Sequence, residues 1–300
     1  MILTQCAACA APLGLSLGKK CGRCSTRYCG PACQAQHWKE GGHDKLCKRI
    51  KKCGGAEQYY ANQKHADAVK TATDACAEDT NGQTCYICTE AVHWKTKEGL
   101  VRGCACRGTA GFAHVSCLAE QAKILVAEAE ENNLEIDPRF ARRYRFILCE
   151  QDYHGVVACA LGWACWKTYV GRPETDQLQG MAMGQLGNGL YVSGHHEDAL
   201  FVKEAELSME RRRGAPEENI LVVQGNLAST YQKVGRLDEA LRRRKVVYSD
   251  YVKLKGQDHE LAILAAYNYA TSLVSLNKAL RRSQVVVAKN DTRGTSRTWR

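Results

Sequence analysis

Apolar positions in the second half of the chain recur with the three-to-four-residue spacing of helices. From residue 176 onward, short turns that contain glycine or a polar residue separate the apolar segments. Pro216 fits the first turn of a helix, and Asp258 precedes one. The pattern predicts five helices, over residues 176–192, 195–213, 216–234, 236–255 and 258–276.

These predicted helices are spaced regularly along the chain. Gly194 and Gly235 are 41 residues apart, and Gly214 and Gly256 are 42 residues apart. Small residues recur in step where two helices would need close approach, at Gly187, Ala228 and Ala270. A helix pair of this kind cannot bury its apolar face alone, so neighbouring pairs are expected to stack.

Residues 176–280 resemble tetratricopeptide repeats of the long, kinesin-light-chain-like kind. Residues 197–200 (EDAL) return at residues 238–241 as DEAL. The resemblance implies a curved α-helical array whose concave groove binds peptides. A plain helical bundle without a ligand is the alternative, because only two full repeats show and the third departs from the pattern at Asn277.

Upstream of the repeats, the pattern predicts two more helices and one segment with too little apolar material. Residues 56–77 alternate alanine with polar residues, which predicts a helical linker within residues 48–81. Residues 155–175 carry Trp163 and Trp166 on one helical face, which predicts a connecting, packing helix. Residues 6–47 hold few apolar residues besides alanine and cysteine, too few to offset chain entropy by burial.

Cysteine changes this picture, because it accounts for 17 of the 300 residues and is clustered. The N-terminal residues lack the basic flank and apolar core of a signal peptide, and the most apolar stretch, residues 155–166, is too short to span a membrane. We therefore expect an intracellular protein, cytoplasmic or nuclear and not secreted, with no membrane contact. Thiols stay reduced there, so the clusters predict metal sites rather than disulfides.

The first cluster consists of four ligand pairs within residues 6–47. Zinc prefers four thiolates or imidazoles at tetrahedral angles, and a Cys-x-x-Cys turn or a helical i,i+4 pair points two ligands at one ion. Four pairs predict two closed zinc sites that replace a missing apolar core. The predicted ligands are Cys6, Cys9, Cys21, Cys24, Cys29, Cys33, His43 and Cys47.

This segment resembles the MYND zinc finger, also at Tyr28, Gln34 and the pair His37-Trp38. The resemblance implies interleaved sites and makes His37 a surface or packing residue. One zinc would be held by Cys6, Cys9, Cys29 and Cys33, and the other by Cys21, Cys24, His43 and Cys47. It also implies binding of short, often proline-containing peptides of partner proteins.

The second cluster resembles the RING-CH (RING-variant) finger, through the Cys104-x-Cys106 spacing and the seven residues that separate Cys106 from His114. Its metal ligands would be Cys85, Cys88, Cys104, Cys106, His114, Cys117 and Cys149. By resemblance, Cys85, Cys88, His114 and Cys117 form one complete site.

The other site of this finger departs from the family pattern. Phe146 occupies the position of the seventh ligand, which leaves Cys104, Cys106 and Cys149. His154, Cys159 or a water could complete that site, or its zinc could be lost. We therefore expect one or two zinc ions in residues 82–154, besides the two in the first finger.

Two functions compete for this module. By resemblance, Ile87 is the kind of residue that contacts a ubiquitin-conjugating enzyme, so the module could act as a ubiquitin ligase. We favour the other interpretation, a structural zinc platform, because this chain departs from the family pattern at ligand positions and at positions that would contact the enzyme. A RING finger supplies no nucleophile or general base, and no catalytic residue is predicted.

The net charge of +10 does not by itself indicate a nucleic-acid partner. Residues 281–300 carry six basic residues against one acidic residue, lack periodicity and are expected to be disordered. The basic runs at residues 211–213 and 242–245 more commonly solvate a helix face or complement a helix terminus. Nucleic acid is therefore not expected as a partner.

The sequence thus predicts a mainly α, zinc-binding adaptor for protein partners. Its alternatives are a RING-CH-type ubiquitin ligase whose flanking modules select the substrate, and a transcriptional cofactor. The predicted segments are a MYND finger (6–47), a linker (48–81), a degenerate RING-CH-like module (82–154), a connecting helix (155–175), helical repeats (176–280) and a tail (281–300).

Overall fold

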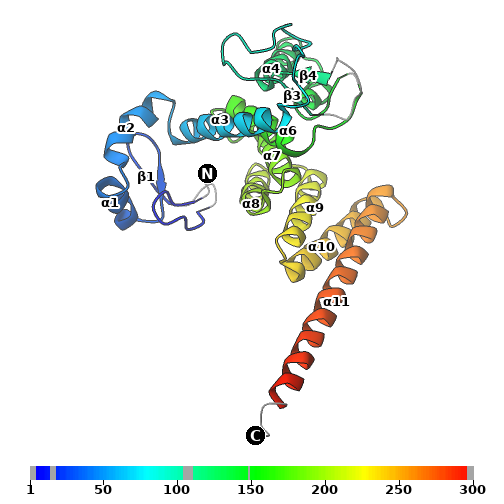
Figure 1. The fold of residues 1–300 in the computed structure, drawn as a ribbon. Helices are drawn as coiled ribbons and strands as arrows, with labels where there is room; N and C mark the ends of the chain where they lie inside the picture. Colours follow the sequence, from blue (N-terminus) through cyan, green and yellow to red (C-terminus); the bar gives the residue numbers. More distant parts are fainter. Residues whose placement is uncertain (1–4, 14–17, 104–110, 148, 296–300) are drawn as a thin grey trace. The chain divides into compact units, whose positions relative to one another are not determined.

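The computed structural model describes residues 5–13, 18–103, 111–147 and 149–295, with side chains up to residue 281. Within these ranges the chain is mainly helical (Figure 1). It divides into two compact units, Met1–Gly214 and Ala215–Arg300. Among the described helices, none is both long and apolar enough to cross a membrane.

The N-terminal finger is built from very short elements. Strands β1 (Lys19–Lys20) and β2 (Arg27–Tyr28) pair antiparallel and are followed by helices α1 (Pro31–Lys39) and α2 (His43–Lys52). Its core is largely sulfur: buried cysteines surround Tyr28 and Ile50, and Leu13 and Tyr59 complete the cluster. Such a core gains little from apolar burial, so another source of stability is needed.

Helix α3 (Ala56–Cys76) is the predicted helical linker, and it packs along α6 (Gly155–Tyr169). Ala61, His65, Val69, Ala72 and Cys76 recur every three or four residues and are buried. The alternation of alanine with polar residues is therefore an amphipathic face of small side chains.

The second zinc module holds a small hairpin and a helix. Strands β3 (Val101–Arg102) and β4 (Phe112–Ala113) pair antiparallel, and α4 (Val115–Glu131) follows directly. The helix α5 (Asp137–Phe140) and the 3-10 turn η2 (Ala141–Arg143) lead back toward α6. Leu100, Phe112, Leu118 and Phe146 are buried in a shared core.

Helix α6 is buried on all sides, with 11 of its 15 residues inside. Its closest neighbour is α7 (Gln177–Val192), and glycines make that approach possible. A Cβ built on Gly189 would lie 2.6 Å from the Ala158 carbonyl oxygen, and one on Gly162 would lie 3.2 Å from the Gln185 carbonyl oxygen. The predicted packing role of α6 is confirmed.

Helix α7 also leaves room for charged side chains of α8 (His196–Arg212). Lys203 and Glu206 are buried between the two helices, and the Lys203 Nζ donates to the Asn188 Oδ1 at 2.8 Å. A Cβ on Gly184 would lie 2.7 Å from the Glu206 Oε1. Burial raises the pKa of Glu206 to about 7, although Lys203 opposes the shift.

The second unit consists of helices α9 (Glu217–Lys233), α10 (Leu237–Lys255) and α11 (Glu260–Thr295), packed in sequence order. Leu221, Val247, Tyr251, Ala262 and Ala265 form its core. The buried Arg244 joins α10 to α11 by donating to the Asn268 carbonyl oxygen at 2.7 Å and to the Ser272 hydroxyl at 2.8 Å.

The structure confirms the predicted repeat helices to within one or two residues at every end but one. Helix α11 continues to Thr295, whereas the sequence predicted an end at residue 276 and disorder from residue 281. No glycine or proline occurs between Glu260 and Gly294, so nothing local stops the helix. Ala270 was predicted at a close helix approach, but it is exposed.

Candidate metal centres

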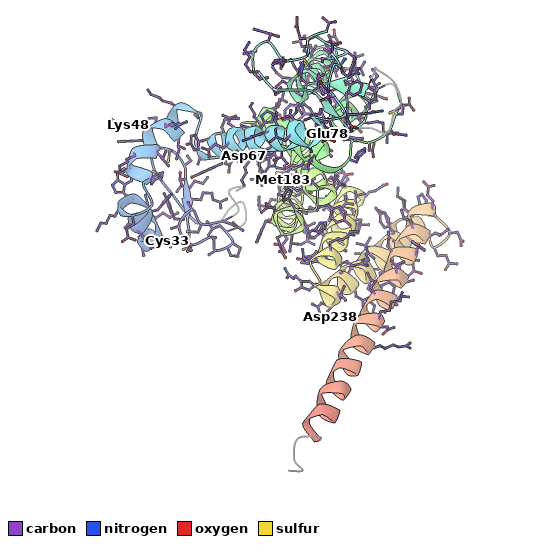
Figure 2. All side chains as sticks on the ribbon, viewed as in Figure 1. Cys33, Lys48, Asp67, Glu78, Met183 and Asp238 are labelled. Atoms are coloured by element: carbon purple, nitrogen blue, oxygen red, sulfur yellow. The ribbon has the colours of Figure 1, made fainter. Side chains whose placement is uncertain are left out.

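The structure brings the predicted ligands together in three groups of four. Within each group, all ligand atoms lie within 4.8 Å of one another. The groups are Cys6, Cys9, Cys29 and Cys33; Cys21, Cys24, His43 and Cys47; and Cys85, Cys88, His114 and Cys117. The labelled Cys33 lies on α1 (Figure 2). The interleaved pairing implied by the MYND resemblance is the pairing that the fold produces.

The three Cys-x-x-Cys pairs share one turn. In each, the residue after the second cysteine donates its N–H to the carbonyl oxygen of the first, at 2.8–2.9 Å, and has a φ near 60°. These residues are Ala10, Ser25 and Thr89. A left-handed φ is uncommon outside glycine, so the turn is held by its surroundings. It directs both sulfurs of a pair to one point.

Distances within the groups fit a tetrahedral zinc ion. The Cys9 and Cys29 sulfurs are 3.7 Å apart, and those of Cys21 and Cys47 are 3.8 Å apart. Zinc–sulfur bonds of about 2.3 Å predict sulfur–sulfur edges of about 3.8 Å in a tetrahedron. The cysteines are free thiols, and their separations far exceed a disulfide bond.

The first cysteine of each turn is prepared to be a thiolate. Burial would raise the pKa of Cys6, but backbone N–H groups of Cys9, Cys29 and Ala8 outweigh it and lower that pKa to about 6. Burial is likewise outweighed by backbone N–H groups at Cys21 and Cys85, whose pKa values are also lowered. Hydrogen bonds to the charged form stabilise it.

Cys33 and Cys47 need a nearby cation in order to ionise, because their pKa values are raised. A hydrogen bond with Cys29 raises the pKa of Cys33 to about 12, while burial and the neighbouring thiols raise the pKa of Cys47 to about 12. Like charges this close cannot coexist without compensation. A dication supplies it, so the donor set fits Zn²⁺ at all three groups.

Both histidines present the ligand form. The Cys24 sulfur lies 3.4 Å from His43 Nε2, and the Cys88 sulfur lies 3.4 Å from His114 Nδ1. On the far side of the ring, His114 Nε2 lies 3.4 Å from the Ala91 carbonyl oxygen, which fixes its tautomer. Burial lowers the pKa of His43 and of His114 and keeps both rings neutral.

Of the fourth predicted site, the structure describes only the segment around Phe146 and Cys149, because Cys104 and Cys106 lie outside the described residues. Phe146 and Glu150 repeat two features of the turn in the three cysteine pairs: Glu150 has a φ of 54°, and its N–H donates to the Phe146 carbonyl oxygen at 2.9 Å. Phe146 is buried edge-on against Tyr86 and Tyr153. An aromatic ring therefore lies where the RING-variant resemblance implies a ligand sulfur.

The same turn occurs once more, at a place that sequence reasoning missed. The Lys97 N–H donates to the His93 carbonyl oxygen at 2.9 Å, and His93 Nδ1 accepts from the Thr96 N–H at 3.1 Å. Here the imidazole is hydrogen-bonded within the protein, and among the described residues it belongs to none of the three groups of ligands. A His-x-x-Thr sequence carries no metal signal, so only the fold reveals the likeness.

His37 fulfils the packing role implied for it. Its Nδ1 lies 3.0 Å from the Tyr28 hydroxyl oxygen, and its ring stacks on His43 with centroids 5.1 Å apart. His37 therefore supports a ligand from outside the group of four.

Ile87 lies at the edge of an open groove between the second zinc module and α6. The groove has a volume of about 930 Å³, and its lining includes Trp94, Ile124 and Lys167. Trp94 and Ile124 are exposed apolar side chains, whereas Ile87 is half-buried. This lining gives the groove an apolar wall beside the zinc ligands.

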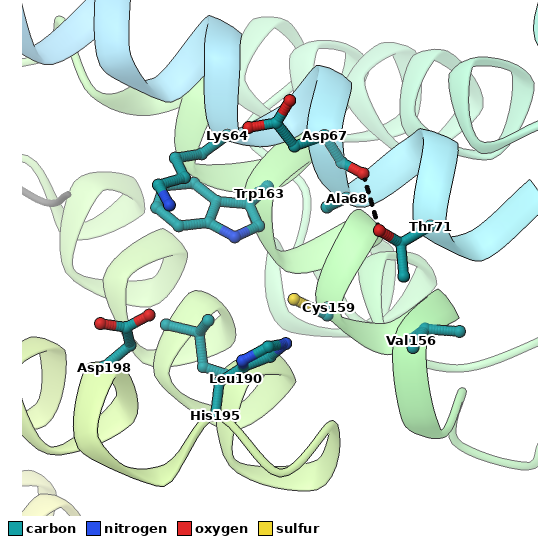
Figure 3. Close-up of a pocket in the computed structure, with 10 residues that line it drawn as sticks. All are labelled: Lys64, Asp67, Ala68, Thr71, Val156, Cys159, Trp163, Leu190, His195 and Asp198. Carbon is teal, nitrogen blue, oxygen red and sulfur yellow. Dashed lines mark hydrogen bonds between the residues drawn. The ribbon is translucent and has the colours of Figure 1, made fainter.

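Cys159 and His195 line a smaller cavity of about 160 Å³ between α3, α6 and α7 (Figure 3). Burial raises the pKa of Cys159, so its thiol stays protonated at neutral pH. Cys159 is therefore a packing thiol in this cavity. It is not grouped with other ligands among the described residues.

Comparisons with known proteins gave matches to the two cysteine-rich segments and to a structure of helical repeats. A crystal structure of nearly identical TPR-like repeats of a kinesin light chain from Podospora anserina aligns with a TM-score of 0.38 and 14% identity, covering 62% of this chain and 90% of that one. No curated protein matches the chain. The MYND finger model matches residues 6–47, and the RING-variant domain model matches residues 85–133. Over these two segments the chain is similar to MYND fingers and to RING-variant domains, and it holds three Cys/His groups that fit zinc.

Proposed function

We propose that the protein is an adaptor that binds peptides of partner proteins through its MYND-like finger and its helical repeats. The observation that carries this proposal is that each zinc group is closed. Four protein ligands complete the tetrahedron, which leaves no position for a substrate or a reactive water. The metal then serves to shape a surface.

The finger offers an aromatic side chain on that surface. Trp38 on α1 is exposed, and its ring lies 5.7 Å from the ring of His43, a member of the second group of four. Zinc at that group would therefore fix the position of Trp38. Exposed aromatic side chains are what proline-containing peptides dock against.

The second unit offers a groove between α9, α10 and α11, whose mainly apolar lining includes two amide side chains. A cavity of about 200 Å³ is lined by Asn226 and Asn268, which are 42 residues apart and thus occupy equivalent repeat positions. Val222 and Leu264 line it with the same spacing. An amide both donates and accepts, so repeated asparagines can hold the backbone of an extended peptide.

Panning a random peptide library against the full, zinc-loaded chain tests the adaptor function. We expect enriched peptides whose affinity falls about tenfold on Trp38→Ala or on the pair Asn226→Ala and Asn268→Ala, the loss typical of an interface hot spot. Val192→Ala, an exposed apolar position outside both surfaces, is the matched control. Failure to enrich any peptide, or affinities unchanged in both variants, would contradict the proposal.

A second candidate function is that of a ubiquitin ligase, which the groove beside Ile87 favours. Its apolar wall could receive a ubiquitin-conjugating enzyme. We expect ubiquitin chains when the protein is mixed with activating enzyme, ubiquitin and a broad panel of conjugating enzymes, and their loss with Ile87→Ala. Leu134→Ala, exposed beyond the end of α4, is the control. Chains that persist in Ile87→Ala, or no chains with any enzyme, would rule out this candidate.

A further inference from the structure

Helix α11 exposes an apolar face that its repeat counterpart buries. Ile263 is 57% exposed, whereas Leu221, 42 residues earlier on α9, is 1% exposed. Leu273 is 38% exposed, whereas its counterpart Tyr231 is 5% exposed. Ala270 is exposed too, whereas Ala228 is fully buried. The repeat pattern thus marks this face as one that is built to be covered.

The opposite face of α11 is already occupied by α10. Ala262, Ala265 and Ser272 are buried there, and Arg244 of α10 donates to the Ser272 hydroxyl. Tyr248 and Tyr269 stack between the same two helices. The exposed residues therefore form a separate surface.

This surface is a straight seam with the spacing of paired helices. We define the α11 seam as Glu260, Ile263, Tyr267, Ala270, Val274 and Arg281, all exposed. Successive members are three, four, three, four and seven residues apart, which keeps them on one side of the helix. Leu264 and Leu273 flank the seam and are also exposed. An apolar stripe of this kind on a soluble helix marks an interaction site.

The charges at the two ends of the seam favour a second α11 in antiparallel orientation as its binding partner. Glu260 lies at one end and Arg281 at the other, with Ala270 near the midpoint. A second α11 placed antiparallel puts Glu260 against the partner's Arg281, and the two-fold axis repeats that pair. The same register puts Tyr267 against the partner's Val274. A parallel copy would instead set glutamate on glutamate and arginine on arginine.

We propose that the protein forms a two-fold symmetric dimer in which the α11 seams of two copies pair antiparallel. The small side chain of Ala270 lets the two helices approach closely at the crossing point. The contact is isologous, so it closes at two copies and leaves no free seam. It also places two copies of the peptide-binding groove in one particle.

Sedimentation velocity of the full chain over a wide concentration range tests the dimer. Tyr267→Glu should raise the dissociation constant of the dimer about a hundredfold. Each copy would remove one tyrosine ring from the interface and would have to desolvate a carboxylate in its place. Val246→Glu, which changes an exposed apolar residue of α10, is the matched control and should leave the dimer intact. Circular dichroism checks that both variants fold. A chain that is monomeric at every concentration would overturn the proposal.

Charge reversal tests the antiparallel orientation and does not depend on the apolar variant. Glu260→Arg alone, or Arg281→Glu alone, should weaken the dimer about tenfold, because two attractive pairs become repulsive. The double variant should restore it. In a parallel dimer the single variants would exchange one like-charge pair for another and change little, so an unaffected Glu260→Arg dimer would overturn the antiparallel arrangement.

Discussion

Replacing Cys21 by alanine is expected to unfold residues 6–47 while the helical repeats remain folded. The finger core consists mainly of zinc-ligating sulfur around Tyr28 and Ile50. Structural zinc contributes about 10–16 kcal/mol per site in zinc-finger peptides. The apolar residues of this segment cannot replace a loss of that size. Limited proteolysis with mass spectrometry should show cleavage within residues 6–47 and protection of residues 176–280.

Cys53→Ala is the matched control for this experiment, because Cys53 is partly buried beside the finger core but outside every group of four. It should keep the zinc content of the unaltered chain, whereas Cys21→Ala should lose one or two ions per chain. Chelation should reproduce the cleavage within residues 6–47 seen for Cys21→Ala. If residues 6–47 resist protease after zinc is removed, zinc binding by these cysteines is not what stabilises the finger.

Gly189→Ala is expected to destabilise the first unit by about 2–3 kcal/mol, as overpacking of a tight core does. The added Cβ would lie 2.6 Å from the Ala158 carbonyl oxygen, which is backbone and cannot turn aside. Helices α6 and α7 would have to separate, and α6 is buried on all sides. Urea unfolding followed by tryptophan fluorescence reports this, since Trp163 and Trp166 are buried on α6.

Gly225→Ala is the control with the opposite sign. Gly225 lies in helix α9, and a Cβ there meets nothing within 4 Å. Alanine is favoured over glycine in a helix by up to about 1 kcal/mol, so this variant should stabilise the second unit. Equal effects of the two substitutions would show that helix propensity and not close packing decides the outcome at Gly189.

The metal-binding pairs could be predicted from spacing, whereas which pairs share one ion was implied by the resemblance to MYND fingers. A Cys-x-x-Cys pair can direct two sulfurs to one ion because the two ligands are close along the chain. The structure therefore groups Cys6 with Cys33 and Cys24 with His43 as the family resemblance implied. The packing of Phe146 could not be predicted from spacing, because it depends on Tyr86 and Tyr153, the aromatic rings that surround it in the fold.

The positions of most repeat helices could also be predicted from the sequence. Their period and their ends follow from local turn residues, so four of the five repeat helices could be placed closely. The end of α11 could not, because the chain between Glu260 and Gly294 has no breaker and the loss of periodicity was interpreted as disorder.

The sequence by itself determined the zinc-ligand pairs, the helix period and the absence of a sufficient apolar core in the finger, because these follow from the spacing and composition of short segments. Only the tertiary structure decided that Gly189 lets α7 approach α6 closely, that Phe146 packs between aromatic rings, and that Ala270 is exposed while Ala228 is buried. These features depend on which surfaces meet across long chain separations, and the pattern of residues along one helix does not state which of its faces another helix will cover.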